Sequence, residues 1–332
     1  MQPVAEPAND LSRVHALMER VRARLAAAIR GRDDVIELIL TALLADGHVL
    51  LEDYPGSGKT ILSRALGEAL RAEEGDQFAP FRRIQFTPDL LPSDVTGTAV
   101  FEPETGRFAF RPGPIFAHVV LADEINRTSP KVQAAMLEAM AEKQVTSDNT
   151  SYRLDELFFV IATQNPLDLA GTYPLPKPQL DRFLFKIRMQ HIAREDELQV
   201  LAEYPTPRLQ RAAELPGVTR DELVWARSVV REQVALDTAV RGALVDIARR
   251  LRDDPRVLQG VSTRALMLML PALQSRAVLH QRDYVGPQDV EALVTPVLHH
   301  RIDPAPGVTD VDAVLREACA PEIEKLSRMS LR

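Results

Sequence analysis

The segment Gly56-Ser57-Gly58-Lys59-Thr60 constrains the fold of this chain more than any other part of the sequence. It stands between a short apolar run at residues 48–51 and residues 59–71, where apolar side chains recur at helical spacing. Glycines let such a strand-to-helix loop approach a ligand closely, and the helix N-terminus favours an anion. Because Lys59 can reach the β- and γ-phosphates of a nucleotide and Thr60 can hold Mg²⁺, the segment predicts a phosphate-binding loop.

The first position of this loop departs from the usual pattern, because Asp53 stands where glycine is expected. The glycine-rich core is intact, although a chance turn between a strand and a helix would also explain this segment taken alone. The residues predicted here to bind the nucleotide are Asp53, Tyr54, Pro55, Gly56, Ser57, Gly58, Lys59, Thr60 and Ile61.

Apolar segments of strand length alternate with helical segments in the first part of the chain. Strands are predicted at residues 48–51, 83–86, 117–122, 158–162 and 183–187. Helices are predicted at residues 11–45, with a break at Arg30-Gly31, and at residues 59–71 and 130–142. This alternation predicts a parallel sheet with helices on both faces. Phenylalanines flank a turn at Thr105-Gly106, which predicts a β-hairpin between the second and third strands.

The strand pattern stops near residue 190. Beyond it only helices are predicted, at residues 195–203, 219–234, 237–251, 262–279 and 287–300. The predicted fold class is therefore α/β, with a P-loop nucleoside triphosphatase core at residues 1–190 and a C-terminal all-α lid domain at residues 191–332. Residues 1–10 are polar and contain two prolines, so we expect them to be disordered.

A second chemical signal is the pair of carboxylates that ends the apolar run at residues 119–122. Asp123 is expected to bind Mg²⁺ through water, and Glu124 to polarise the water that attacks the γ-phosphate. An acidic helix cap after a strand would explain this pair in isolation. The phosphate-binding loop upstream, in the same alternating pattern, favours the catalytic interpretation.

Three further polar residues are weaker candidates for catalysis. Asn165 follows the fourth predicted strand and can position water or touch the γ-phosphate, although asparagine before proline is also an ordinary turn. Arg182 can stabilise charge in a transition state, often in a neighbouring subunit, or can form a surface ion pair with Asp181. Arg264 begins a helix of the lid, where it either reaches the nucleotide between the domains or is simply solvated.

The composition disfavours several other classes of protein. A formal net charge of -7 gives no global positive field for nucleic acid, although a local basic patch is compatible with it. The single cysteine, Cys319, cannot form an intramolecular disulfide, which is typical of a reducing cytoplasm. There is no apolar run of about 18 residues, so we expect a cytoplasmic protein without a membrane span.

Five stretches of the sequence together resemble the MoxR family of AAA+ ATPases. They are residues 83–97, 122–127, 162–166, 171–176 and 180–183, and the resemblance extends from about residue 15 to residue 302. An acidic residue in place of the first loop glycine is common in that family, so the resemblance removes the doubt raised by Asp53. It also implies an AAA+ ATPase fold that binds ATP or ADP with Mg²⁺.

The resemblance assigns roles that the residues alone leave open. It implies that Asn165 is sensor 1, that Arg182 is the arginine finger acting on a neighbouring subunit, and that Arg264 is sensor 2. Gly31 is similar to the segment beside the adenine, and the hairpin at Thr105-Gly106 is similar to an insert that faces the pore of a ring. Sensor 2 usually follows a proline in this family.

That proline is replaced by Thr263 in this chain, but the arginine after it is retained. The resemblance further implies a homo-oligomer, usually a hexameric ring, that remodels or matures a client protein. Such proteins often aid metal or cofactor insertion and work with a protein that carries a von Willebrand factor A domain. Two alternatives stay open: a ring ATPase stimulated by nucleic acid, and a nucleotide-gated binding scaffold.

Overall fold

The computed structural model describes residues 9–52, 57–72, 75–147, 149–165, 171–204 and 208–330. The predicted loop residues Asp53, Tyr54, Pro55 and Gly56 therefore lie outside the described residues. Residues 1–8, which belong to the predicted disordered end, lie outside them as well.

A five-stranded parallel sheet forms the centre of the first part of the chain, as predicted. Its strands lie in the order β2-β5-β8-β1-β9. They are β1 (Val49–Glu52), β2 (Ala79–Gln85), β5 (Ala117–Asp123), β8 (Phe159–Gln164) and β9 (Phe185–Arg188). The middle strands are almost continuously apolar because both faces of the sheet are covered.

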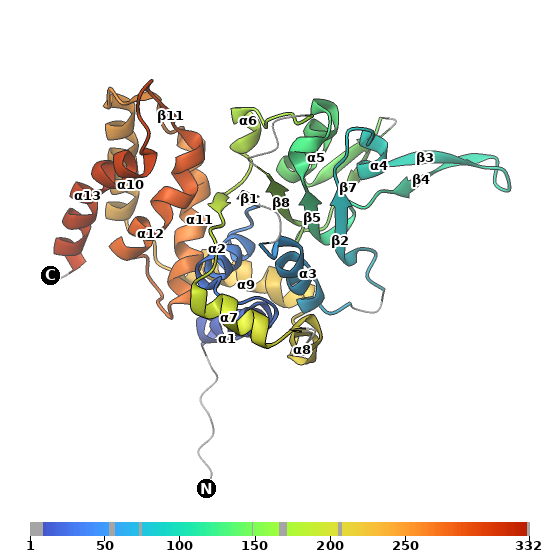
Figure 1. The fold of residues 1–332 in the computed structure, drawn as a ribbon, viewed down its shortest axis with the longest axis horizontal. Helices are drawn as coiled ribbons and strands as arrows, with labels where there is room; N and C mark the ends of the chain where they lie inside the picture. The colour runs from blue at the N-terminus through green and yellow to red at the C-terminus, as the bar shows by residue number, and fades with distance from the viewer. Residues whose placement is uncertain are drawn as a thin grey trace, which may run out of the picture.

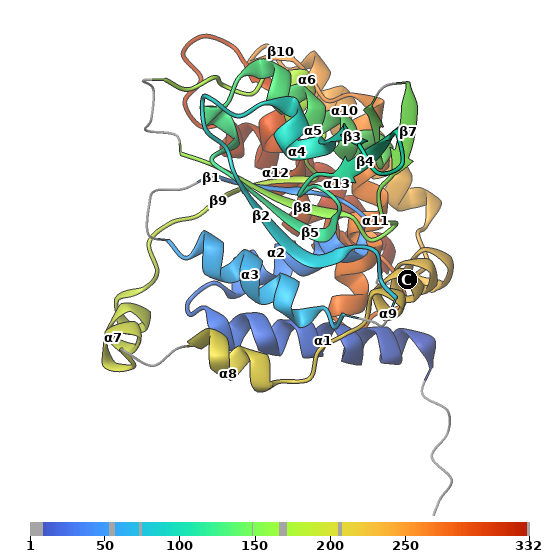
Figure 2. The same cartoon turned by 90° about the vertical axis from the view of Figure 1, so that its right-hand side faces the viewer.

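Alternate side chains of each strand enter two different hydrophobic cores. In β1, Val49 and Leu51 face one core, whereas Leu50 faces the other. The first core is covered by α1 (Asp10–Ala28), α2 (Asp33–Leu44) and α3 (Lys59–Ala69), and the second by α4 (Pro92–Thr96) and α5 (Pro130–Glu142). Figure 2 shows α1, α2 and α3 below the sheet and α4 and α5 above it. The predicted helices on both faces are therefore confirmed.

The break between α1 and α2 falls at the predicted place. Asn9 caps α1, and the helix ends at Ala28. Gly31 then has a φ of +63°, and a Cβ at this position would come within 2.5 Å of the Asp196 carboxylate. Glycine is therefore required at the turn that separates the two helices.

Two β-hairpins leave the sheet on the side opposite the lid. The predicted hairpin consists of β3 (Gly97–Glu102) and β4 (Arg107–Pro112), and it projects far from the body in Figure 1. A second hairpin, β6 (Gln144–Ser147) and β7 (Thr150–Arg153), was not predicted, because its alternating pattern is short and mostly polar. The rings of Phe110 and Tyr152 stack at 3.7 Å, so the two hairpins are in contact.

The later part of the chain is mainly helical, as predicted. Its helices are α7 (Arg194–Ala202), α8 (Arg208–Glu214), α9 (Arg220–Gln233), α10 (Thr238–Asp253), α11 (Thr263–Leu279), α12 (Pro287–Leu298) and α13 (Val311–Ser330). The prediction that this part contains helices only is wrong. Strands β10 (Val257–Gln259) and β11 (Asp303–Pro304) form a small antiparallel pair. They are too short to leave a periodic pattern, and the helices α8 and α13 were also missed.

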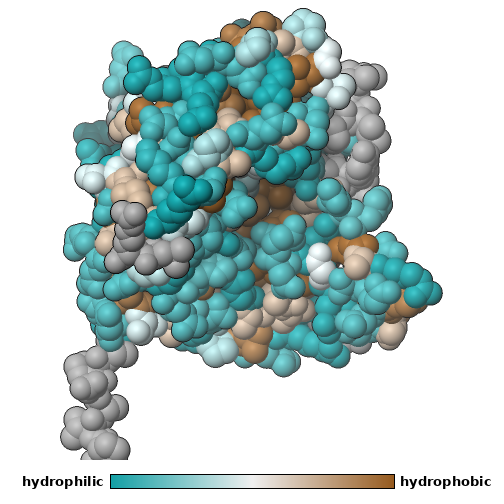
Figure 3. All heavy atoms as spheres, turned by 90° about the vertical axis from the view of Figure 1, so that its left-hand side faces the viewer, coloured by the Kyte–Doolittle hydropathy of each residue, from teal (hydrophilic) through white to brown (hydrophobic). Residues whose placement is uncertain are grey.

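The hydrophobic core below the sheet continues into the helical part. Helices α8 and α9 follow the predicted boundary near residue 190, yet both pack against α1. Side chains of α10, α11, α12 and α13 belong to the same buried cluster as those of α1 and α2. The lid face is mostly hydrophilic, with hydrophobic residues scattered over it (Figure 3). Within the described residues, no helix is both long and apolar enough to cross a membrane.

Candidate nucleotide-binding site

The predicted site residues gather where the parallel strands end. Strand β8 lies between β1 and β5, with Glu52 opposite Gln164 and Ala122 opposite Ala162. The residues after all three strands therefore meet at one edge of the sheet, which is where open α/β sheets bind ligands.

The N-terminus of α3 is open to an anion. Gly58 precedes the helix with a φ of +92°, and a Cβ there would lie 2.7 Å from Ile29 Cδ1, so only glycine fits. Lys59 and Thr60 form the first turn. Among the described residues no side chain caps this helix, which leaves its first N–H groups to bind a phosphate.

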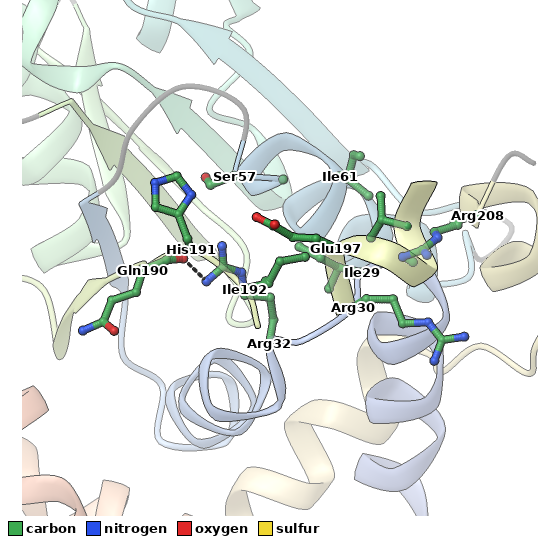
Figure 4. Close-up of a pocket in the computed structure, with 13 residues that line it drawn as sticks. Ile29, Arg30, Arg32, Ser57, Ile61, Gln190, His191, Ile192, Glu197 and Arg208 are labelled. Atoms are coloured by element: carbon green, nitrogen blue, oxygen red, sulfur yellow. Dashed lines mark hydrogen bonds between the residues drawn. The ribbon is translucent and has the colours of Figure 1, made fainter. Parts of the chain in front are cut away.

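A cavity of about 290 Å³ adjoins this helix N-terminus (Figure 4). Its walls come from the end of α1, the start of α2, the start of α3, residues 190–192 and α7. Its volume is near the lower end of the roughly 300–1,000 Å³ typical of small-molecule pockets. Ser57 Oγ and Arg32 Nε are buried and have no hydrogen-bond partner in the described part of the chain. Such orphaned polar atoms fit a polar ligand that supplies their partners.

Positive side chains surround the cavity. Arg32 donates to the carbonyl oxygen of Gln190, which fixes it at the cavity wall (Figure 4). Arg30 and Arg208 both pair with Glu203, at 3.0 and 3.1 Å. Arg30 flanks Gly31, so the structure places the segment predicted to lie beside the adenine at this cavity.

Glu52 anchors the strand that leads into the phosphate-binding loop. Its carboxylate contacts Lys186 at 2.9 Å, Gln164 at 2.7 Å and Arg188 at 3.2 Å. Burial by itself raises the pKa of Glu52, but the hydrogen bonds and charges of these neighbours outweigh burial and lower it. Glu52 therefore stays ionised and ties β1 to β8 and β9. Sequence reasoning did not identify it, since its partners come from distant strands.

Asp123 ends β5 with a carboxylate that is already bound on both oxygens. Oδ1 accepts a hydrogen bond from Thr163 Oγ1 at 2.7 Å, and Oδ2 accepts bonds from Arg83 Nη2 and Nε at 2.6 and 3.1 Å. Asp123 is only 7% exposed. Its place at the strand end suits a metal-bound water rather than a direct ligand, because its oxygens already have partners.

Glu124 turns sharply away from β5. Its backbone lies in the left-handed region at φ 57°, and its N–H donates to Thr163 Oγ1 at 2.8 Å. Such a conformation costs free energy in a residue other than glycine, and it often marks a functional site. The carboxylate Oε2 accepts from Gln85 Nε2 at 2.9 Å and lies 3.3 Å from Arg127 Nε.

Three residues around this pair were missed by sequence reasoning: Arg83, Gln85 and Thr163. Arg83 and Gln85 alternate on β2, next to β5, and point to the same side. A period-two pair of polar residues at the end of the second strand was the available signal. The role of this polar pair depends on the pairing of β2 with β5, which the local sequence does not predict.

Asn165, the predicted sensor 1, directly follows the end of β8. It lies at the same edge of the sheet, is 8% exposed, and accepts a hydrogen bond from Asn126 Nδ2 on its carbonyl oxygen at 3.4 Å. The structure thus brings Asn165 between the end of β5, which carries Asp123, and the end of β1, which precedes the loop to Lys59.

The two candidate arginines are not among the residues that line the cavity. Arg182 follows α6 (Lys177–Leu180) and is partly exposed; within the described residues its side chain forms no hydrogen bond or ion pair. Arg264 is 60% exposed, and its Nε lies 3.7 Å from Asp181 Oδ2. Asp181 also accepts from Arg301 Nε at 2.8 Å. The alternative of an Arg182–Asp181 ion pair is therefore not found.

A parallel sheet with a phosphate loop after β1, adjacent carboxylates after β5 and a helical lid defines a AAA+ type of P-loop module. Residues 48–185 match the model of the ATPase family associated with various cellular activities (AAA), and residues 249–318 match that of the AAA lid domain. The chain belongs to the MoxR family of AAA+ ATPases.

Two relatives named MoxR support this assignment, and a third relative is similar over nearly its whole length. The chaperone MoxR1 of Mycobacterium tuberculosis is 36% identical over 93% of this chain and 80% of its own length. The protein MoxR of Paracoccus denitrificans is 30% identical over 95% and 96%. The uncharacterised protein YeaC of Bacillus subtilis is 42% identical over 96% and 98%.

The fold has a close match among solved structures. The crystal structure of a candidate ATPase from Cytophaga hutchinsonii superposes with a TM-score of 0.80 at 31% sequence identity. The match covers 92% of this chain and 96% of the other. The predicted fold class, an α/β ATPase core with a helical C-terminal part, is therefore confirmed.

Proposed function

We propose that this chain hydrolyses ATP to ADP and phosphate and uses the reaction to remodel or mature protein partners. The observation that carries the proposal is the turn at Glu124, which places one carboxylate beside Asp123 at the sheet edge that also carries the start of α3. That carboxylate accepts a hydrogen bond from Gln85 and lies beside Arg127.

Each residue at this edge has a role in the proposed reaction. Lys59 and the N–H groups at the start of α3 bind the phosphates, and the cavity beside Gly31 and Ser57 takes the nucleoside. Thr60 and the water-bridged Asp123 would hold Mg²⁺, which when bound neutralises charge on the phosphates. Glu124 orients and polarises the attacking water.

The remaining polar groups complete the site. Asn165 positions the water or the γ-phosphate from the end of β8. Arg182 serves as a finger for the nucleotide of a neighbouring chain, and its lack of partners among the described residues supports that role. Arg264 acts as the lid sensor. An assembly, a hexameric ring by family resemblance, follows from a finger that acts in trans.

The partners proposed for this ATPase are a client protein and a protein with a von Willebrand factor A domain. Help with metal or cofactor insertion and a cytoplasmic location also belong to the proposal. The relative named as a chaperone supports a protein client. The net charge of -7 disfavours a nucleic-acid motor. Stimulation of ATP hydrolysis by DNA or RNA would support that alternative.

Two substitutions test the proposed reaction. In phosphate-release assays we expect Glu124→Gln to stop turnover while ATP stays bound. Arg182→Ala is expected to lower turnover by about 10³–10⁵-fold, because the finger stabilises transition-state charge, without preventing nucleotide binding. Undiminished hydrolysis by assembled Arg182→Ala protein would contradict the finger, and undiminished hydrolysis by Glu124→Gln would contradict the base.

A further inference from the structure

One part of the lid holds the short segment that carries Arg182. This segment runs from α6 to the start of β9, and η2 (His299–Arg301) after α12 packs against it. Arg301 lies at the centre of the contact, and its side chain is only 3% exposed. The segment with the proposed finger is therefore attached to the lid of its own chain.

The guanidinium of Arg301 binds the main chain on both sides of Arg182. It donates to the carbonyl oxygens of Asp181 at 3.1 Å, Phe183 at 2.6 Å and Leu184 at 3.1 Å. Its Nε donates to the Asp181 carboxylate at 2.8 Å. The side chain of Arg301 thus fixes the main chain immediately before and after Arg182.

Neighbouring contacts reinforce this attachment. His300 Nε2 lies 3.2 Å from the carbonyl oxygen of Phe183, and Lys177 of α6 pairs with Asp303 of β11. Arg264 approaches the other oxygen of Asp181. Elements from three places in the lid therefore converge on a segment of about eight residues, between Lys177 and Leu184.

Arginine suits this position for physical reasons. The carbonyl groups that Arg301 binds follow α6 and converge on one side chain, and a planar guanidinium offers five donors in a fixed geometry. Burial lowers the pKa of Arg301, while the hydrogen bond and charge of Asp181 oppose that shift. A lysine at this position keeps the charge but lacks the planar, forked arrangement of N–H donors, so it cannot hold several carbonyl groups at once.

We propose that Arg301 is a positioning residue for Arg182, so that the lid of each chain sets the finger which that chain presents to its neighbour. The inference rests on the proposed function, because it requires Arg182 to act on a neighbouring nucleotide. Arg301 acts through the residues that flank Arg182, by binding their main-chain carbonyl groups and the Asp181 carboxylate.

Steady-state ATP hydrolysis by full-length Arg301→Lys protein tests the proposal. A misplacement of about 1 Å can cost about 10²-fold in rate, so we expect kcat to fall by about 10–100-fold. The KM for ATP and the affinity for a fluorescent nucleotide are expected to stay unchanged, because the variant's own cavity is intact.

Arg227→Lys is the matched control. Arg227 is 7% exposed, donates to the carbonyl oxygens of Leu43 and Glu156, and pairs with Asp46. None of these contacts involves the segment that carries Arg182, so the kcat of Arg227→Lys protein is expected to stay at the parental value. Asp181→Asn, at a partly exposed site, gives a smaller fall in kcat and serves if Arg301→Lys fails to fold.

A mixing experiment separates positioning from a general defect. Lys59→Ala protein lacks a working phosphate loop but keeps Arg301 and Arg182. In mixed assemblies it presents an intact finger to the sites of Arg301→Lys or Asp181→Asn chains, so hydrolysis per variant chain is expected to recover. A defect confined to the variant's own structure persists in the mixture.

The outcomes are distinguishable from failure of the proposed function. If the parent does not hydrolyse ATP, or Arg182→Ala keeps the parental rate, the proposed function fails. If Arg182→Ala is impaired while folded Arg301→Lys and Asp181→Asn keep the parental kcat, the positioning role is overturned. Absence of recovery in the mixed assemblies overturns it as well.

Discussion

The Glu124 carboxylate is held by Gln85 and Arg127, and in the proposed reaction we expect it to leave this arrangement when it polarises the attacking water. We therefore expect Gln85→Ala to raise the basal rate of phosphate release. A hydrogen bond to a charged group at a partly exposed site is worth about 1 kcal/mol, which corresponds to about fivefold in rate. Gln144→Ala is the control, because Gln144 binds the exposed Glu142 away from the site. A lower or unchanged rate in folded Gln85→Ala protein would show that Gln85 does not restrain Glu124.

At the residue scale, the sequence predicted the polar residues that follow strands. It did not predict the residues whose side chains bind them. Lys59, Thr60, Asp123 and Glu124 stand in runs whose local pattern indicates their role. Gln85, Thr163 and Glu52 have no such run, because each acts through a neighbour on a strand distant in the sequence.

At the scale of elements, the contact between the two hairpins is expected to stabilise β3 and β4. Phe110 of β4 and Tyr152 of β7 stack almost parallel, and such a pair contributes about 0.5–1.5 kcal/mol beyond burial. We expect Tyr152→Ala to speed amide hydrogen exchange across β3 and β4 without changing exchange in the central sheet. Tyr284→Ala is the control, because Tyr284 is an exposed aromatic residue between α11 and α12 of the lid. Unchanged exchange in Tyr152→Ala would mean that the hairpins are ordered independently.

The sequence predicted the elements with strong periodicity and missed the rest. The predicted helix at residues 130–142 coincides with α5, and the five sheet strands were found within a few residues. The hairpin of β6 and β7, the pair of β10 and β11, and the clamp around Arg301 depend on partners far along the chain. Local propensity carries no information about such pairings.

The whole molecule is joined by a buried charge cluster as well as by its continuous core. His118 of β5 is 2% exposed; its Nε2 lies 2.6 Å from Asp76 and its Nδ1 3.2 Å from Asp155. Asp155 also pairs with Arg220 at the start of α9. Burial lowers the pKa of His118, but the two carboxylates outweigh burial and raise it. The pKa values of Asp76 and Asp155 are lowered, chiefly by hydrogen bonds to His118 that overcome their burial.

These shifts predict how stability depends on pH. The contribution of His118 is fully present below its unfolded pKa of about 6.5 and is lost as pH rises through the higher folded value. The contribution of the carboxylates is present above about pH 4 and is lost on acidification. We expect the difference in unfolding free energy between the parent and His118→Gln to be largest between about pH 4 and 6.5, and to shrink above it.

Urea unfolding at a series of pH values measures this difference. His280→Gln is the control, because His280 is 41% exposed and contacts Glu37 alone among the carboxylates of the described residues. Its difference from the parent is expected to vary much less with pH. A difference that stays constant for His118→Gln from pH 5 to 9 would contradict the assigned role of the cluster.

Helix α7 forms one wall of the nucleotide cavity, yet none of its side chains is buried. Leu198 and Leu201 of α7, and Tyr204 after it, are exposed. A helix with so few buried contacts is expected to open locally at a smaller cost in free energy than the buried central strands. We therefore expect the lifetime of a bound nucleotide to depend on how often α7, one wall of the cavity, opens.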